Sequence, residues 1–118
     1  MGLEIKDYKV LRALMNHTYH PTLISLTMWC SVRHSRFLIT SAFRDDKDSV
    51  HGHGRGLDLS SKWWNEKDLN KIIDDLNDHW EYDPSRPKMR CGAFHNKNHI
   101  HLKVHNKTIY HNEGRKQK

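Results

Sequence analysis

The stretch Ser49-Val50-His51-Gly52-His53-Gly54-Arg55-Gly56-Leu57-Asp58 gathers two histidines, three glycines and a carboxylate into ten residues. A second group of histidines follows downstream, between His95 and His101. Zinc prefers imidazole nitrogen and carboxylate oxygen, and catalytic zinc sites combine three protein ligands with a water molecule. Because glycine permits unusual backbone angles, this loop can fold two side chains toward one point. The sequence therefore predicts a zinc site made by His51, Asp58 and one histidine of the second group.

The residues around Asp58 alternate as they do in a β-strand. Within residues 54–60 the two leucines face one side, so Asp58 faces the other. His99 and His101 are two residues apart in residues 99–104, so a strand there projects both imidazoles from one face. We expect this pair to supply the third ligand and a neighbouring group that transfers protons.

The remaining periodicity predicts an α+β fold. Apolar residues at helical spacing predict three helices: over 5–16, from Pro21 to about His34, and from the cap Asn65 to the turn at 83–87. Short apolar runs predict strands over 37–43, 54–60, 89–94, 99–104 and 108–110, with a charged loop over 44–50. We expect one small domain over 1–113, in which two or three helices flank an antiparallel sheet that carries the zinc site. Residues 114–118 are expected to form a basic, disordered tail.

The composition suits a small soluble protein, with 36% hydrophobic and 29% charged residues among 118. No apolar run approaches the roughly 20 residues that cross a bilayer, and no secretory signal begins the chain, so we expect synthesis in the cytoplasm. The net charge of +6 attracts polyanions such as nucleic acid or an anionic cell wall, or simply favours solubility. Cys30 and Cys91 form no CxxC pair, and we expect buried free thiols in a reducing compartment.

Two motifs resemble those of a known zinc metallopeptidase superfamily. The stretch from Ser49 to Asp58 resembles the SxHxxGxAxD signature of the D-alanyl-D-alanine and L-alanyl-D-glutamate peptidases, with Gly56 in place of the usual alanine. The segment 39–44 resembles the strand and arginine that precede that signature. The segment 98–104 resembles the HxH ending shared by murein endopeptidases and the hedgehog signalling domain. The similarity extends over about residues 20–105 and implies a small α+β fold.

The resemblance also implies roles for individual residues. It makes His51, Asp58 and His101 the zinc ligands and His99 a second active-site histidine. Arg44 matches a position that holds a substrate carboxylate or stabilises the transition state, a task that suits a guanidinium. Ser49, which opens the signature, is expected to contact substrate beside it. His53 occupies a variable position of the signature and is expected at the rim of the site.

The chain departs from the family at the general base. The carboxypeptidase branch has a glutamate three residues before the last ligand, where this chain has Asn98, and the hedgehog-like glutamate corresponds to His95. No Asp or Glu occurs between Asp83 and Glu113. Because imidazole takes up and releases protons near neutral pH, we expect His99 or His95 to act as the base.

These features predict a zinc peptidase that cuts peptidoglycan stem or cross-link peptides. The small size, with neither a signal nor a separate wall-binding module, is typical of a phage lytic enzyme (an endolysin) or a related bacterial product that acts on the cell wall after release. We expect a monomer. One alternative is a zinc-binding domain of the same fold that has lost hydrolysis, which the missing glutamate favours. Another is a nucleic-acid-binding protein that uses the positive charge, although no such motif is present and no nucleic acid is expected.

Some prominent residues are left without a role in this hypothesis. Trp63 and Trp64 either border a substrate groove or pack against the helix that follows them. Of the six histidines outside both motifs, five are expected to be structural or at the surface: His20, His34, His79, His105 and His111.

Overall fold

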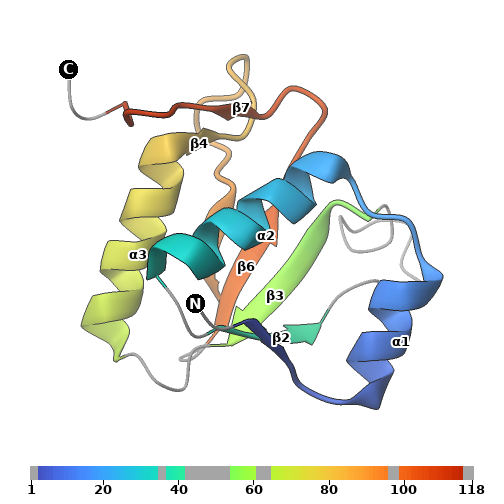
Figure 1. Cartoon of the computed structure of the whole chain (residues 1–118). Helices are drawn as coiled ribbons and strands as arrows, with labels where there is room; N and C mark the ends of the chain where they lie inside the picture. The colour runs from blue at the N-terminus through green and yellow to red at the C-terminus, as the bar shows by residue number, and fades with distance from the viewer. Residues whose placement is uncertain (1–2, 35–36, 42–53, 61–64, 96–98, 116–118) are drawn as a thin grey trace.

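A five-stranded mixed sheet with the strand order β1-β2-β3-β6-β5 forms the centre of the protein (Figure 1). The computed structural model describes residues 3–34, 37–41, 54–60, 65–95 and 99–115. β1 pairs with β2 in parallel, and the other neighbouring strands pair antiparallel. The strands are β1 (Leu3–Ile5), β2 (Phe37–Ser41), β3 (Gly56–Ser60), β5 (Gly92–His95) and β6 (His99–Lys103). The α+β class and the single domain expected from the sequence are confirmed.

Three helices accompany the sheet: α1 (Tyr8–Asn16), α2 (Pro21–His34) and α3 (Glu66–His79). α1 begins where the Asp7 side chain accepts a hydrogen bond from the Val10 N–H at 3.0 Å. α3 begins in the same way at the predicted cap, because Asn65 accepts from the Asp68 N–H at 2.8 Å. α2 begins at Pro21, whose fixed φ suits a first helical turn.

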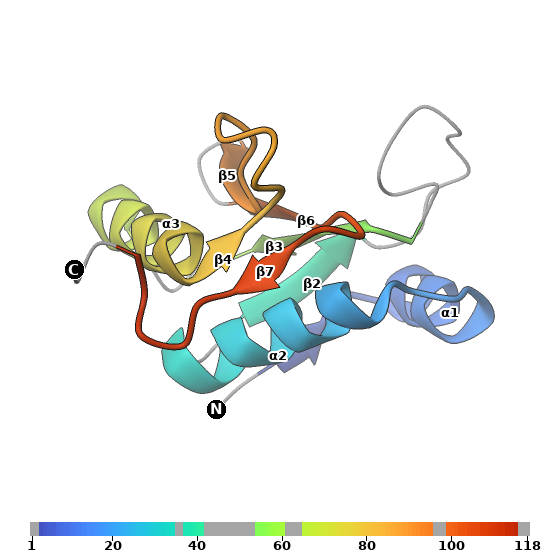
Figure 2. The ribbon, with the colours of Figure 1, turned by 90° about the horizontal axis from the view of Figure 1, so that it is seen from above.

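The core lies between one face of the sheet and the helices α2 and α3 (Figure 2). Burying each of its large aliphatic side chains stabilises the fold by roughly 1.5–3 kcal/mol. Because strand residues alternate in direction, the intervening residues of β3 and β6 face away from this core. The sheet contributes Leu57, Leu59, Ile100 and Leu102, and the helices contribute Leu23, Leu26, Leu69 and Leu76.

A two-stranded sheet, β4 (Trp80–Glu81) with β7 (Ile109–Tyr110), forms at the C-terminal end of α3. It brings the last described segment back against the body of the protein (Figure 1). No helix in the described part of the chain is long and apolar enough to span a membrane.

The structure corrects several predicted boundaries. The first helix begins at Tyr8 rather than at residue 5, because residues 3–5 form the edge strand β1. This parallel edge makes the sheet mixed, whereas an antiparallel sheet was expected. The strand predicted over 89–94 begins at Gly92, and β4 was not predicted. The helix from Pro21 to His34 is confirmed.

Gly54 joins the glycine-rich motif to the rest of the fold. Its φ is +67°, in the left-handed region that glycine adopts without steric cost. A Cβ at this position would collide with the Thr18 carbonyl, and the Gly54 carbonyl accepts a hydrogen bond from the His20 N–H at 2.8 Å. This glycine therefore allows the segment before α2 to pack against the start of β3.

Candidate functional site

Asp58 and His101 face each other on the neighbouring strands β3 and β6. The antiparallel register pairs them directly, and His101 Nδ1 lies 2.7 Å from Asp58 Oδ1. The Asp58 side chain is 11% exposed and that of His101 is 24% exposed, so the pair is largely screened from solvent while the imidazole stays accessible. The predicted alternation around Asp58 is confirmed, and it aims the carboxylate at one histidine of the second cluster.

His99 lies on the same face of β6 as His101, two residues away. Its register partner on β3 is Ser60, and its partner on β5 is His95. Among the residues that the structure describes, the ring nitrogen His99 Nδ1 is buried without a hydrogen-bond partner, as is Trp80 Nε1. Buried polar atoms in proteins are nearly always paired, and an unpaired one calls for an explanation such as an ion, a water molecule or a catalytic role. This imidazole is therefore a candidate to contact a ligand.

The chemistry of Asp58 and His101 suits zinc. An imidazole nitrogen and a carboxylate oxygen, both ordinary zinc ligands, lie 2.7 Å apart on facing strands. The donor types of this pair therefore fit two of the three predicted ligands.

Several predicted site residues lie outside the described part of the chain: Arg44, Ser49, His51 and His53, together with Trp63 and Trp64. His95 is described by its backbone alone, at the end of β5 beside His99. Within the described ranges, no three His, Cys, Asp or Glu residues are grouped as a metal site. The role of His51 as third ligand and those of Arg44 and Ser49 stay predictions.

Five of the six histidines outside the motifs have the following contacts. These are His20 with Asn106 at 2.9 Å, His34 with Asp75 at 2.7 Å, His79 with the Asp75 carbonyl at 2.9 Å, His105 with Asp83 at 3.9 Å and His111 with Glu81 at 3.0 Å. Each contact links two segments or closes a local turn, which is a structural use of the ring.

Asp75 is the centre of a charged cluster that the sequence did not reveal. Its carboxylate accepts hydrogen bonds from Arg33 Nε at 2.5 Å and from His34 Nε2 at 2.7 Å, so it joins the C-terminal end of α2 to α3. Burial alone would raise the pKa of Asp75, but the hydrogen bonds from Arg33 and His34 outweigh it and lower that pKa. Burial lowers the pKa of His34. We assign this cluster to the packing of the two helices.

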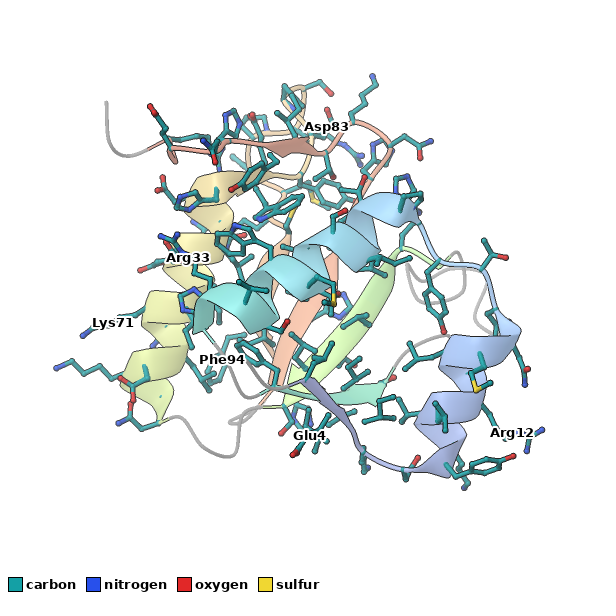
Figure 3. The ribbon with its side chains drawn as sticks, in the orientation of Figure 1. Glu4, Arg12, Arg33, Lys71, Asp83 and Phe94 are labelled. Carbon is teal, nitrogen blue, oxygen red and sulfur yellow. The ribbon has the colours of Figure 1, made fainter. Side chains whose placement is uncertain are left out.

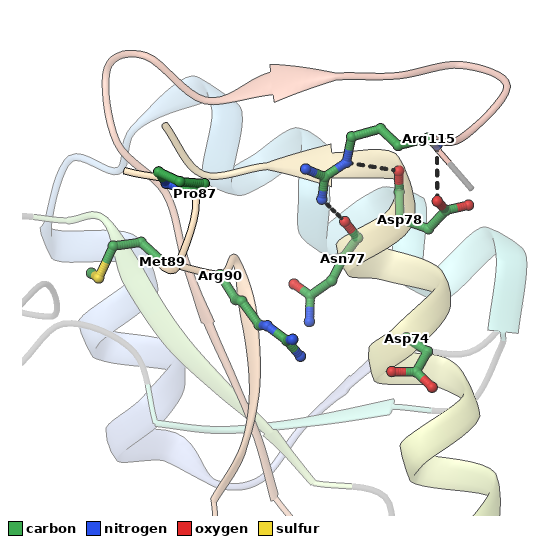
Figure 4. A pocket seen from close by; sticks show the side chains of 7 residues that line it. All are labelled: Asp74, Asn77, Asp78, Pro87, Met89, Arg90 and Arg115. Atoms are coloured by element: carbon green, nitrogen blue, oxygen red, sulfur yellow. Dashed lines mark hydrogen bonds between the residues drawn. The ribbon is translucent and has the colours of Figure 1, made fainter. Parts of the chain in front are cut away.

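A polar hollow of about 250 Å³ lies beside the C-terminal end of α3 (Figure 4). Arg115 closes one side of it: its backbone N–H donates to the Asp78 carboxylate at 2.9 Å, and its guanidinium donates to the Asn77 and Asp78 carbonyls. Gly114 and Arg115 therefore pack on the domain, although they were expected to belong to a disordered tail. Residues 116–118 lie outside the described ranges.

Two features near the site are not indicated by the sequence. Ser60 lies beside His99, and Lys103 continues the same face of β6, above the Tyr82 ring at 5.2 Å. The place of Ser60 follows from the β3–β6 register, and the contact of Lys103 follows from the packing of Tyr82 against β6. The alternation in each strand was readable, but nothing in the sequence states which residue of one strand faces which residue of the other.

Comparisons of this chain with protein-family models, with curated proteins and with solved structures find no significant match. Function is therefore inferred from the motifs and from the geometry of Asp58, His99 and His101.

Proposed function

We propose that this protein is a zinc peptidase that hydrolyses stem or cross-link peptides of peptidoglycan. The observation that carries the proposal is the Asp58–His101 contact of 2.7 Å on adjacent strands, with the unpartnered His99 Nδ1 on the same face. The two motifs that resemble the peptidase superfamily contribute the residues of this face. Zinc, when bound, supplies a Lewis acid that polarises a peptide carbonyl and lowers the pKa of a water molecule.

In the proposed site Asp58, His101 and His51 hold the metal. β3 and β6 fix the first two side chains through backbone pairing, so these ligands need little rearrangement. Ligands placed on strands rather than on loops are held more accurately. His51 precedes Gly54 and β3 in the sequence.

His99 is the proposed general base, with His95 as its alternative. A base takes a proton from water and passes it to the leaving amine, and imidazole does both near neutral pH. Asp58 is already engaged by His101, so among the described residues of this face His99 is the side chain with a ring nitrogen left for proton transfer. Arg44 and Ser49 would hold the substrate, Arg44 through a carboxylate.

The substrate class follows from the resemblance and from charge. Peptidoglycan peptides carry free carboxylates, and the chain has an excess of six positive charges. Such an excess raises the local concentration of an anionic polymer around the enzyme. The same reasoning supports action on the cell wall after release from a producing cell.

Zinc content tests the metal site. We expect Asp58→Asn and His101→Gln to lose most bound zinc, measured by elemental mass spectrometry after dialysis. The matched controls are Asp74→Asn, an exposed carboxylate on α3, and His17→Gln, an exposed histidine after α1; both should keep the zinc of the unmodified chain. Undiminished zinc in both site variants would overturn the assignment.

Hydrolysis is tested separately, by mass spectrometry of muropeptides released from purified peptidoglycan with and without a chelator. We expect products only without the chelator, and none from His99→Gln, which should still bind zinc. A zinc-loaded chain that releases no product supports the second candidate, a zinc-binding domain without hydrolysis. The absence of Asp and Glu from residues 84–112 is the observation that favours this candidate.

A further inference from the structure

α2 is apolar on two opposite faces. Its inner face packs in the core, where Leu23, Leu26 and Cys30 are almost wholly buried. Its outer face carries an apolar ridge of three side chains spaced four residues apart. These are Ile24, Met28 and Val32, which are 54%, 44% and 65% exposed and are called here the outer ridge. A helix that is apolar on both sides is typical of one covered on both sides.

Two apolar hollows flank the outer ridge. One, of about 230 Å³, lies toward α1 and includes Leu14, Tyr19, Ile24 and Met28 in its wall. The other is a shallow groove of about 670 Å³ toward β4 and β7. Its wall includes Met28, Val32, Trp29, Trp80 and Tyr110. Both hollows include Met28 in their walls, so the outer ridge and the two hollows belong to one apolar surface.

The surface around the outer ridge carries almost no net charge, which bears on the kind of partner it can bind. None of the described residues lining the first hollow is charged, and Arg33 is the charged residue lining the second. Arg33 is neutralised by Asp75, at 2.5 Å, and lies 5.3 Å from the Trp29 ring centre. The cations Arg12 and Lys71 lie on the outer sides of α1 and α3 instead (Figure 3).

Two copies of a chain with net charge +6 repel each other over most approaches. Across this neutral surface they meet without bringing unpaired like charges together. An anionic membrane or an acidic protein would find no unpaired cation in the wall of either hollow, as far as the described residues go. We propose that the outer ridge is the contact between two copies of this chain.

The spacing of the ridge sets the arrangement. It is symmetric about Met28, so a two-fold axis there places Ile24 of one copy opposite Val32 of the other and Met28 against itself. α2 lies on the outer side of the molecule (Figure 2). Asp58 and His101 alternate with the core leucines and isoleucine of β3 and β6, so they face away from the helices. The dimer therefore leaves both candidate sites open, and it stands independently of the proposed peptidase. It departs from the monomer expected from the sequence.

Sedimentation analysis across the micromolar range tests the proposal. We expect the unmodified chain to reach the mass of two 14.1 kDa chains. Met28→Asp should remain a monomer, and Met15→Asp, the same change at a methionine 75% exposed on α1, should remain a dimer. A monomeric unmodified chain overturns the proposal, as does a dimer that survives Met28→Asp. Binding of a monomeric chain to phosphatidylglycerol vesicles that Met28→Asp abolishes would also overturn it, in favour of a membrane surface.

A cross-link provides a second test that does not depend on a disruptive charge. In Met28→Cys the new thiols meet at the two-fold axis, so mild oxidation should give a covalent dimer on a non-reducing gel. Met15→Cys should give none. The native thiols of Cys30 and Cys91 are buried and should not compete. A Met28→Cys chain that is folded by circular dichroism but no more cross-linked than Met15→Cys would contradict the two-fold arrangement.

Discussion

Asn77 offers the sharpest test of how α3 holds the sheet. Its side chain is buried at 8% exposure. Its amide forms two hydrogen bonds with the backbone of Gly92 in β5. The Asn77 Nδ2 donates to the Gly92 carbonyl at 2.8 Å, and the Gly92 N–H donates to Asn77 Oδ1 at 2.9 Å. Because β5 is the last strand of the sheet, this amide takes the place of a neighbouring strand at that position.

Asn77→Ala leaves two buried backbone groups without partners. Each such group costs about 1–3 kcal/mol, so we expect the two together to lower the unfolding free energy by about 2–6 kcal/mol. That is a large part of the roughly 5–15 kcal/mol that stabilises a domain. Asn70→Ala is the matched control, since Asn70 is exposed on the same helix and both changes gain the same helix propensity, at most about 0.7 kcal/mol.

Urea unfolding followed by circular dichroism measures both variants. We expect the midpoint of Asn77→Ala to fall well below that of Asn70→Ala, with an unchanged slope. If the unfolding free energies of the two variants agree within about 0.5 kcal/mol, the two Asn77–Gly92 hydrogen bonds add nothing to stability and the reasoning fails.

Three further outcomes are expected. Gly54→Ala should cost at least about 1–2 kcal/mol in thermal unfolding, because φ is +67° there and a Cβ meets the Thr18 carbonyl; an unchanged midpoint would contradict this. A backbone hydrogen bond from Ser85 lowers the pKa of Asp83 from 3.8 to about 2, so its ionised form stabilises the fold above pH 3.8 and that contribution is lost as the pH falls toward 2. The stability gap between the unmodified chain and Asp83→Asn should therefore shrink over that interval, and a constant gap would refute the linkage. Burial raises the pKa of Cys91 to about 12 and raises that of Cys30, so Ellman's reagent should react with these thiols only after unfolding.

Local patterns predicted the parts of the fold that depend on local chemistry. The Asn65 cap and the apolar spacing after it were sufficient to locate α3, and Pro21 located the start of α2. β1 was missed because it has three residues, and the apolar residues near it continue into the periodicity of α1. Its place in the sheet depends on a parallel pairing with β2, which has no local signal.

The candidate site divides in the same way. Alternation indicated that Asp58 faces away from the leucines and that His99 and His101 share a face. The contact between Asp58 and His101 depends on the register of two strands 43 residues apart in sequence, which only the packed sheet determines. The unpartnered His99 Nδ1 is likewise a property of its surroundings and has no counterpart in the sequence pattern.

The pairing of β3 with β6 has a thermodynamic consequence for whatever binds Asp58 and His101. In an unfolded chain, bringing residues 43 positions apart together costs about 3 kcal/mol of loop-closure entropy before any contact forms. The native sheet removes that cost, so a cation recognises the folded chain far better than the unfolded one. At a hundred times its dissociation constant, such a ligand adds about 2.7 kcal/mol to the unfolding free energy. Cation binding to this pair and the stability of the fold are therefore linked. The melting temperature should rise with the concentration of a cation that binds Asp58 and His101.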